Sequence, residues 1–347
     1  MKKIRTAIIG ATGFTGSELA RLVHLHPNFE LVAITSESHK GKKFSDVHPQ
    51  FFGLVDLPLV SASEIEDGQV DLVFLGLPHG VSMEYVKDWY HKDLKIVDLS
   101  GDYRLSSPEV YEEWYPKKHV HPEGFEQAVY GMPEIFSNEI KNAKLVANPG
   151  CYPTSAILAV NPLIKGEWVR PETLVIDSKS GTTGAGIKAK PATHFSQVND
   201  NFNAYGIAGH RHTIEIEEIL GIAAGHRIIL QFTPHLLPVD RGILTTTYAS
   251  RRSNKLTNRE ALREYFDEFY ADKPFVRVRN TPPSIKEVRA TNFCDLYPTF
   301  DPRTGNIIVI SVIDNLMKGA AGQAIHNANL MFDLDEQTGL DLVPIKP

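Results

Sequence analysis

Cysteine is scarce in this sequence of 347 residues, which contains only Cys151 and Cys294. Two cysteines are too few for the disulfide framework that holds small secreted domains together. Long apolar runs are missing as well, because no stretch reaches the roughly 20 residues that a membrane-spanning helix needs. Positive charge is not in excess either. The formal net charge is −6, so we expect neither a nucleic-acid partner nor a membrane partner. Small anionic molecules remain as partners, since a local pocket can oppose the overall charge.

The N-terminal stretch MKKIRTAIIGATG places positive charge before apolar residues, as a signal peptide does. Its apolar part is too short for the hydrophobic region of a signal peptide, and it runs directly into a glycine-rich turn. We therefore interpret it as a first strand and expect a cytoplasmic protein.

The length of the chain predicts two domains. Over residues 1–149, short apolar runs alternate with stretches of helical spacing, which is typical of an α/β fold with a Rossmann-like, doubly wound parallel sheet. The expected strands are 5–9, 31–34, 71–75, 96–99 and 144–147, and the expected helices are 16–25 and 83–90.

After Pro149 the strand candidates become longer, and several alternate apolar and polar residues. This pattern predicts an α+β domain over residues 150–315 with a mostly antiparallel or mixed sheet. Its expected strands are 173–179, 227–233, 243–250, 275–279 and 306–313, with one helix at 258–270. A last helix, 318–331, is rich in small residues.

A glycine-rich turn, GATGFTG, follows the first expected strand and precedes the first helix. Glycine lets a strand turn sharply into a helix, and it lets backbone N–H groups approach a pyrophosphate at the helix N-terminus. Gly10, Gly13 and Gly16 are spaced GxxGxxG, which departs from the commoner GxGxxG. The context indicates a dinucleotide site, and the alternative is a purely structural turn.

The end of the second strand bears on the choice of dinucleotide. NAD sites usually place an acidic residue there to bind the ribose 2′-hydroxyl. Here the hydroxyls of Ser36 and Ser38 come first and Lys40 follows, with two more lysines at 42 and 43. This order favours the 2′-phosphate of NADP(H), and Glu37 is the one residue that does not fit unless it points outward.

Cys151 lies in ANPGCYPTSA, directly after a turn and at the expected start of a helix. The positive end of a helix dipole lowers the pKa of a thiol from about 8.5 toward neutrality, which favours the nucleophilic thiolate. The alternative is a buried structural cysteine. Cys294, in an apolar strand-like context, fits that alternative well.

The segment GHRHT supplies two histidines, His210 and His212. A histidine beside a thiol can hold the thiolate and act as a general acid or base. Thr213 is expected to cap a helix that carries Glu215 in its first turn, so that the histidines project from the preceding loop. A zinc site built from both histidines and a cysteine is the alternative, although no fourth ligand is evident.

Arg104 follows the strand 96–99 in the loop SGDYRL. Ligands of α/β proteins bind at the carboxyl ends of the strands, and arginine grips a carboxylate or phosphate with two parallel hydrogen bonds. Arg104 is therefore a candidate for substrate binding, and a surface arginine is the alternative.

Four motifs, GATGFTG, NPGCYPT, GHRHT and NLMKGAAGQA, resemble those of the N-acetyl-gamma-glutamyl-phosphate reductase family, a relative of the aspartate-semialdehyde dehydrogenases. The resemblance covers essentially the whole chain in order. Gly101 stands where the family more usually has alanine, and Ile214 where it often has proline. Neither change removes a reactive group.

The resemblance implies a role for each matching residue. Cys151 is the nucleophile, His212 the acid/base catalyst, and His210 a substrate-binding or alternate catalytic residue. Arg104, Tyr205, Arg211 and Lys188 are expected to bind substrate. The cofactor-binding residues would be Gly10, Thr12, Gly13, Phe14, Thr15, Gly16, Ser36, Ser38, Asn315, Lys318 and Gly319. Residues 316–347 would complete the cofactor domain.

The family implies NADPH-dependent reduction of an acyl phosphate to an aldehyde in arginine biosynthesis, by a homodimer or homotetramer. The same chemistry on a succinylated or carrier-linked glutamyl or aminoadipyl phosphate, or on aspartyl phosphate, is an alternative. A catalytically silent NADP-binding sensor is a more distant one.

Overall fold

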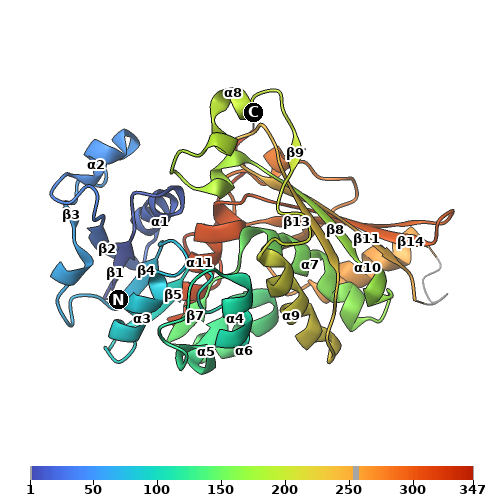
Figure 1. Cartoon of the computed structure of the whole chain (residues 1–347), viewed down its shortest axis with the longest axis horizontal. Helices are drawn as coiled ribbons and strands as arrows, with labels where there is room; N and C mark the ends of the chain where they lie inside the picture. The colour runs from blue at the N-terminus through green and yellow to red at the C-terminus, as the bar shows by residue number, and fades with distance from the viewer. Residues whose placement is uncertain (1, 253–257, 347) are drawn as a thin grey trace. The chain divides into compact units, whose positions relative to one another are not determined.

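The computed structural model describes residues 2–252 and 258–346 (Figure 1). By its internal contacts the chain divides into two units. The first runs to Pro149 and takes in Ala320–Leu342, and the second comprises Gly150–Gly319 and the segment from Val343. In the described residues, no helix combines the length and apolarity that crossing a bilayer requires.

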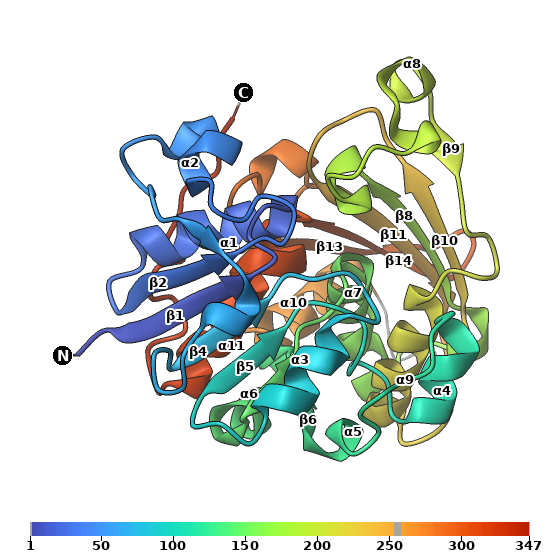
Figure 2. The same ribbon diagram turned by 60° about the vertical axis from the view of Figure 1, so that its left-hand side comes forward.

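The first unit is built on a parallel sheet in the order β3-β2-β1-β4-β5-β7-β6. Its strands are β1 (Ile4–Ile9), β2 (Phe29–Thr35), β3 (Leu59–Val60), β4 (Leu72–Leu75), β5 (Lys95–Asp98), β6 (Ala128–Tyr130) and β7 (Leu145–Ala147). Figure 2 shows β2, β1, β4 and β5 lying next to one another. The strand order reverses between β1 and β4, which is the switch point where such sheets bind ligands. The predicted Rossmann-like parallel sheet is confirmed.

Helices connect and cover these strands. They are α1 (Phe14–Leu25), α2 (Phe44–Val47), α3 (Ser82–Trp89), α4 (Pro108–Trp114), α5 (Gly124–Gln127), α6 (Pro133–Asn142) and α11 (Gly322–Met331), with short 3-10 turns η1 (Pro49–Phe51) and η2 (Ala62–Glu64). Both α1 and α11 pack against the sheet and contact each other. The strands β3 and β6 and the helices α2 and α4 to α6 were not predicted; most of them are short, and short elements carry little periodicity.

The second unit holds a mixed sheet in the order β12-β13-β14-β11-β8-β10-β9. Its strands are β8 (Val175–Ser180), β9 (Asn203–Ala204), β10 (Gln231–Leu236), β11 (Ile243–Ser250), β12 (Val276–Val278), β13 (Cys294–Asp301) and β14 (Asn306–Ile313). The pairs β8/β10 and β12/β13 are parallel and the other pairs antiparallel. The predicted mixed sheet is confirmed.

The helices of this unit are α7 (Cys151–Lys165), α8 (Phe195–Val198), α9 (His212–Ala224) and α10 (Arg259–Phe269). The short turns are η3 (Pro171–Thr173), η4 (Thr182–Ala185), η5 (Pro191–Thr193), η6 (Ile285–Glu287) and the π turn η7 (Met317–Ala321). Helix α7 packs on β11 and β14 and against α9.

Three differences from the predictions stand out in this part of the chain. The strand expected at 227–233 begins only at Gln231, since the Leu230 N–H donates to Glu217 instead of a neighbouring strand. Strand β13 was not predicted, because Pro298 and two aspartates interrupt its apolar pattern. The helix expected at 318–331 starts as the π turn η7 before α11 begins.

Buried hydroxyl groups fasten α7 to the sheet. Ser155 Oγ, on α7, is hydrogen-bonded to Thr245 Oγ1 at 3.0 Å and to Ser311 Oγ at 2.9 Å. Ser178 Oγ lies 2.8 Å from the same Thr245 oxygen. All four side chains are buried, so breaking one bond would leave a buried polar atom unsatisfied at a cost of about 1–3 kcal/mol. These hydrogen bonds fix the position of the helix that begins with Cys151.

The predicted cap at Thr213 is wrong. Helix α9 begins at His212, two residues earlier than a cap at Thr213 implies, and its N-cap is Arg211, which makes no side-chain cap bond. The Thr213 hydroxyl is buried and has no hydrogen-bond partner among the described residues. His212 therefore belongs to the first turn of α9, and only His210 lies in the preceding loop.

We expect Thr213→Val to leave the free energy of unfolding unchanged or to raise it. The change removes a buried, unsatisfied hydroxyl and keeps the shape of the side chain. Urea unfolding followed by circular dichroism measures the effect. A loss of about 1 kcal/mol, which removing a real N-cap costs, would contradict the structure.

Candidate functional site

The turn between β1 and α1 needs glycine at two positions. Gly10 has a φ of +83°, and a Cβ there would lie 2.7 Å from the Gly76 carbonyl oxygen. A Cβ on Gly16 would lie 2.4 Å from the Gly10 carbonyl oxygen. Both residues are therefore required for the close approach of α1 to the sheet.

Gly13 differs from these two glycines. It is the N-cap of α1, and a Cβ there would meet its nearest atom only at 3.9 Å. No side chain caps this helix, so its first N–H groups are available to an anion at the positive end of the helix dipole. Thr12, Phe14 and Thr15 lie half-buried around it. The turn thus fits a dinucleotide pyrophosphate.

Hydroxyl groups gather beside this turn, at the carboxyl end of β2. Thr12 Oγ1 lies 3.1 Å from Ser36 Oγ, which in turn lies 3.4 Å from Ser38 Oγ. Ser38 Oγ is 3.0 Å from His39 Nδ1. These side chains are neutral or positively charged. They therefore suit the 2′-phosphate of NADP(H) better than the ribose 2′-hydroxyl of NAD, which a carboxylate usually binds.

Glu37, the residue that did not fit this interpretation, is exposed and bonds elsewhere. Its carboxylate accepts a hydrogen bond from Ser61 Oγ at 2.8 Å. The nearby Lys40 forms an ion pair with Glu64 at 2.5 Å. Glu37 is therefore engaged by Ser61, and Lys40 by Glu64.

Cys151 is the first residue of α7, and its N-cap Gly150 provides no side-chain cap. It is half-buried and forms no disulfide. Gly319 backs onto it so closely that a Cβ on Gly319 would lie 2.8 Å from Cys151 Cβ. Cys294, in contrast, is fully buried in β13 with Sγ 3.5 Å from Ser311 Oγ, as the structural alternative predicted. The helix start at Cys151 favours a thiolate.

The two histidines of GHRHT lie beside the residue that follows this cysteine. Their ring centroids are 4.8 Å apart, and each lies 5.8 Å from the Tyr152 ring. The backbone N–H of His212 donates to His210 Nδ1 at 3.1 Å. Among the described residues, no three His, Cys, Asp or Glu side chains are grouped so that they could hold a metal ion.

Burial, followed by the charge of Arg211, lowers the pKa of His210 to about 4. The ring is therefore neutral at neutral pH. Because its Nδ1 accepts from the His212 N–H, its proton sits on Nε2. His210 can donate a hydrogen bond but is a poor source of protons at pH 7.

Tyr152 and Tyr205 join hydroxyl to hydroxyl at 2.9 Å, and the Tyr152 hydroxyl also donates to the His235 carbonyl oxygen at 3.2 Å. The Tyr205 ring centroid lies 5.6 Å from that of His210. The structure thus brings Tyr205 into the group around Cys151. Tyr152 was not singled out from the sequence, although its place directly after the cysteine was a usable signal.

Glu215 links the helix of the histidines to the helix of the cysteine. It lies one turn after His212, is 1% exposed, and accepts the Gly150 N–H at 2.8 Å. The sequence indicated an acidic residue in the first turn of α9, but it could not show that the carboxylate reaches the N-cap of α7.

Arg104 is buried rather than on the surface, so the surface alternative is wrong. Its Nε donates to the Asn148 carbonyl oxygen at 2.7 Å and its Nη2 to that of Leu99 at 2.8 Å. Asn148 also accepts from Asn327 Nδ2 at 3.0 Å. Arg104 therefore braces the Asn148–Pro149 turn with two of its nitrogens.

The remaining candidates occupy different surroundings within the second unit. Lys188 and Arg211 are exposed. Asn315 accepts from the Gly242 N–H at 2.7 Å and donates to Thr183 Oγ1 at 3.0 Å. Lys318 is fully buried, with Nζ 5.5 Å from the Phe275 ring centroid.

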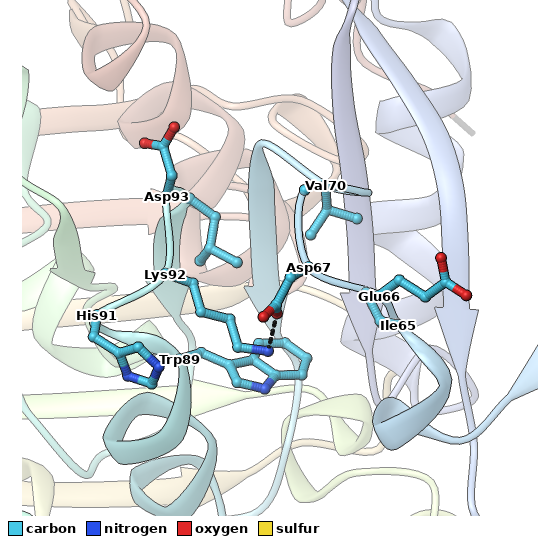
Figure 3. Close-up of a pocket in the computed structure, with 10 residues that line it drawn as sticks. Ile65, Glu66, Asp67, Val70, Trp89, His91, Lys92 and Asp93 are labelled. Carbon is cyan, nitrogen blue, oxygen red and sulfur yellow. Dashed lines mark ion pairs between the residues drawn. The ribbon is translucent and has the colours of Figure 1, made fainter.

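A cavity of about 240 Å³ lies elsewhere in the first unit (Figure 3). Val70 and Leu94, which precede β4 and β5, line it together with Trp89, so it opens at the amino edge of the sheet. An ion pair of 2.5 Å between Lys92 and Asp67 lies over it. None of the candidate site residues lines this cavity.

Family models match both parts of the chain. Residues 5–143 match the NAD binding domain of semialdehyde dehydrogenase, and residues 151–315 match the semialdehyde dehydrogenase dimerisation domain. The two matches leave out little more than the turn before Cys151 and the C-terminal segment.

Curated relatives are similar over nearly their whole length. The chain is 48% identical to the N-acetyl-gamma-glutamyl-phosphate reductase of Pelotomaculum thermopropionicum over 97% of each chain. It is 47% identical to that of Symbiobacterium thermophilum over 97% of each. It is 45% identical to that of Halothermothrix orenii over 99% of this chain and all of the relative. The resemblance drawn from the motifs is confirmed.

Solved structures of more distant proteins share the fold. Aspartate semialdehyde dehydrogenase II of Vibrio cholerae, complexed with ASA, superposes with a TM-score of 0.73 at 16% identity, over 96% of this chain and 99% of that one. The Candida albicans enzyme, solved with NADP, gives 0.69 at 16% identity, over 95% and 99%.

Substitutions of Gly13 and Gly16 are expected to have different effects, one on cofactor binding and one on stability. We expect Gly13→Ala to weaken NADPH binding about tenfold or more, because its Cβ enters the space before α1. The free energy of unfolding should fall by no more than about 1 kcal/mol. Gly16→Ala should lower the free energy of unfolding by about 3 kcal/mol or more. Overpacking typically costs about 1–3 kcal/mol, and here the new Cβ would clash with backbone atoms. Fluorescence titration and urea unfolding measure the two effects. Wild-type NADPH affinity in Gly13→Ala would contradict the assignment.

Proposed function

The chain belongs to the N-acetyl-gamma-glutamyl-phosphate reductase family, and we propose that it reduces N-acetyl-gamma-glutamyl phosphate to N-acetylglutamate 5-semialdehyde with NADPH. Phosphate is released, and the reaction serves arginine biosynthesis. The observation that carries the proposal is Cys151 at a helix start, followed by Tyr152, whose ring contacts His210 and His212 and whose hydroxyl bonds that of Tyr205. Relatives at 45–48% identity carry the same name.

NADP(H) is the cofactor. The turn at Gly13 and the start of α1 would hold the pyrophosphate, and Thr12, Ser36 and Ser38 the 2′-phosphate. Asn315, Lys318 and Gly319 are proposed on the nicotinamide side, and Gly319 already lies against Cys151. When bound, the reduced nicotinamide supplies the hydride that converts an acyl group to the aldehyde level.

Cys151 supplies the nucleophile. Its thiolate attacks the acyl carbon, a C–S bond forms, and the C–O bond to phosphate breaks, which leaves a thioester and inorganic phosphate. After reduction the C–S bond breaks again, which releases the aldehyde and restores the thiolate. Backbone N–H groups at the start of α7 are placed to stabilise the oxyanion in both steps.

His212 is proposed as the acid/base catalyst. It gives a proton to the leaving phosphate and recovers one from solvent, so one proton is consumed in each turnover. His210 suits this role less well, since burial and Arg211 hold its pKa at about 4. Its Nε2–H is instead proposed to donate a hydrogen bond to substrate.

The substrate carries a carboxylate and a phosphate, and cationic side chains are proposed to bind them. Arg211 and Lys188 are exposed, and Tyr205 would line the acyl pocket. Arg104 has two nitrogens engaged by carbonyl groups, so its part would be to hold the turn before Cys151 and, through it, the substrate site.

We also propose a homodimer, with a tetramer as the next possibility, acting in the cytoplasm. A dimerisation-domain match over residues 151–315 supports the assembly. Neither Cys151 nor Cys294 forms a disulfide, which suits a reducing compartment.

We expect Cys151→Ser to abolish turnover while the protein stays folded and still binds NADPH. The assay is the reverse reaction, the phosphate-dependent reduction of NADP with N-acetylglutamate semialdehyde. Succinylated, carrier-linked and aspartate semialdehydes run beside it. Cys294→Ala is the matched control and should keep activity, because Cys294 is buried in β13. Activity in Cys151→Ser would overturn the mechanism, and a preference for another semialdehyde would change the substrate.

The two histidines should separate in their pH dependence. His212→Asn is expected to remove one limb of the kcat/KM profile near neutral pH. His210→Asn should keep that limb and raise KM, since a group with a pKa of about 4 does not change charge there. Loss of the limb in His210→Asn alone would move the acid/base role to His210.

A further inference from the structure

A chain of hydrogen bonds runs from the exposed Tyr205 to a backbone carbonyl group of β10. The Tyr205 hydroxyl lies 2.9 Å from that of Tyr152, and the Tyr152 hydroxyl donates to the His235 carbonyl oxygen at 3.2 Å. Tyr152 is 3% exposed and Tyr205 is 37% exposed. The chain therefore begins at an accessible side chain of the proposed site and passes through a buried one.

The protons of this chain can run in only one direction. A carbonyl oxygen carries no proton, so Tyr152 must donate its single hydroxyl proton to His235. The bond between the two hydroxyls then requires Tyr205 as the donor. Burial raises the pKa of Tyr205 to about 12, and nearby charge on Cys151 acts in the same direction, so this hydroxyl keeps its one proton at neutral pH. With that proton committed to Tyr152, the Tyr205 oxygen can accept a further hydrogen bond but cannot donate one.

This acceptor is held in place relative to the thiol. Besides the bond of its hydroxyl, the Tyr205 backbone N–H donates to the Pro234 carbonyl oxygen of β10 at 3.1 Å. Tyr152 directly follows Cys151 on the first turn of α7, and its ring packs on that of Phe232 with centroids 5.5 Å apart. The acceptor and the nucleophile are therefore both fixed through Tyr152.

A hydroxyl that only accepts selects the chemical group that it meets. It attracts an N–H donor and repels the oxygen atoms of carboxylate, phosphate and carbonyl groups. The amide is the only group of N-acetyl-gamma-glutamyl phosphate that carries an N–H, and a short aliphatic spacer separates it from the carbon that Cys151 attacks. Tyr205 is near enough to the thiol to respond to its charge, which suits a contact at the far end of that spacer.

We propose that the Tyr205 oxygen accepts the amide N–H of the substrate, and that Tyr152, backed by the His235 carbonyl group, orients it to do so. Tyr205 is then a specificity-determining residue for N-acylated substrates, and Tyr152 is a positioning residue. The contact recognises the amide itself, whichever acyl group that amide carries. This inference rests on the proposed reductase function, from which it takes the substrate.

The test compares N-acetylglutamate semialdehyde with its ester analogue, in which an oxygen atom replaces the amide N–H. The ester keeps the shape of the amide but presents an acceptor in place of the donor. In the reverse assay, wild-type enzyme should prefer the amide by about tenfold or more in kcat/KM. Tyr205→Phe should lose this preference, because KM rises for the amide alone while kcat changes little.

Tyr152→Phe tests the orientation of the acceptor. Without the Tyr152 oxygen the Tyr205 proton is no longer committed, so the hydroxyl can turn and donate to the ester. This variant should therefore use the ester better than wild-type enzyme does. Tyr265→Phe is the matched control, because its hydroxyl donates to the Pro162 carbonyl oxygen at 3.1 Å, near the other end of α7. The control should keep the wild-type preference for the amide.

A merely structural role would change KM for the amide and the ester alike. That result in Tyr205→Phe would overturn the proposal, as would a preference that stays at the wild-type value. Calorimetric titration of both compounds into Cys151→Ser protein saturated with NADP gives the same preference as a ratio of Kd values, without turnover. If Tyr205→Phe abolishes this ratio although the wild-type enzyme has no reductase activity, the amide contact stands and the proposed function falls. Equal Kd values for amide and ester would contradict the amide contact and leave the reductase function standing.

Discussion

The N-terminus of α7 is the constraint on which the site depends. Cys151 begins this helix, and the Gly150 N–H before it donates to the buried Glu215 carboxylate of α9. Further along α7, Ser155 bonds two hydroxyl groups of the sheet. The helix can neither slide nor rotate without leaving buried polar groups unsatisfied, so the thiol is held in one place. A nucleophile must be fixed to within a fraction of an ångström to gain from proximity.

The two histidines have different surroundings at this helix start. His212 sits on the first turn of α9, which Glu215 ties to α7, whereas His210 is in the loop before it and accepts the His212 N–H. Burial makes His210 a neutral hydrogen-bond donor. Two chemically identical side chains, two residues apart, thus have different surroundings, and this difference is the basis for the different roles that we propose for them.

Much of this was predictable from sequence because it is local. Apolar runs placed the parallel strands, and the bounds predicted for β11 and β14 are those observed. The helix start at Cys151 followed from the turn before it. The cap predicted at Thr213 was wrong although the local rule was sound, because α9 starts two residues earlier than predicted where it packs on α7. Tertiary contacts override a preference worth about 1 kcal/mol.

What the sequence could not provide is contact across long separations. Glu215 reaches Gly150 over 65 positions, and Arg104 reaches Asn148 over 44. No spacing rule encodes either bond. The glycines of the first turn also differ in a way that the sequence does not show. In the sequence Gly10, Gly13 and Gly16 are equivalent members of one motif. In the structure a side chain at 10 or 16 would strike backbone, while at 13 it would meet open space before a helix start. Two glycines are thus required by the fold, and the third leaves the space that a ligand needs.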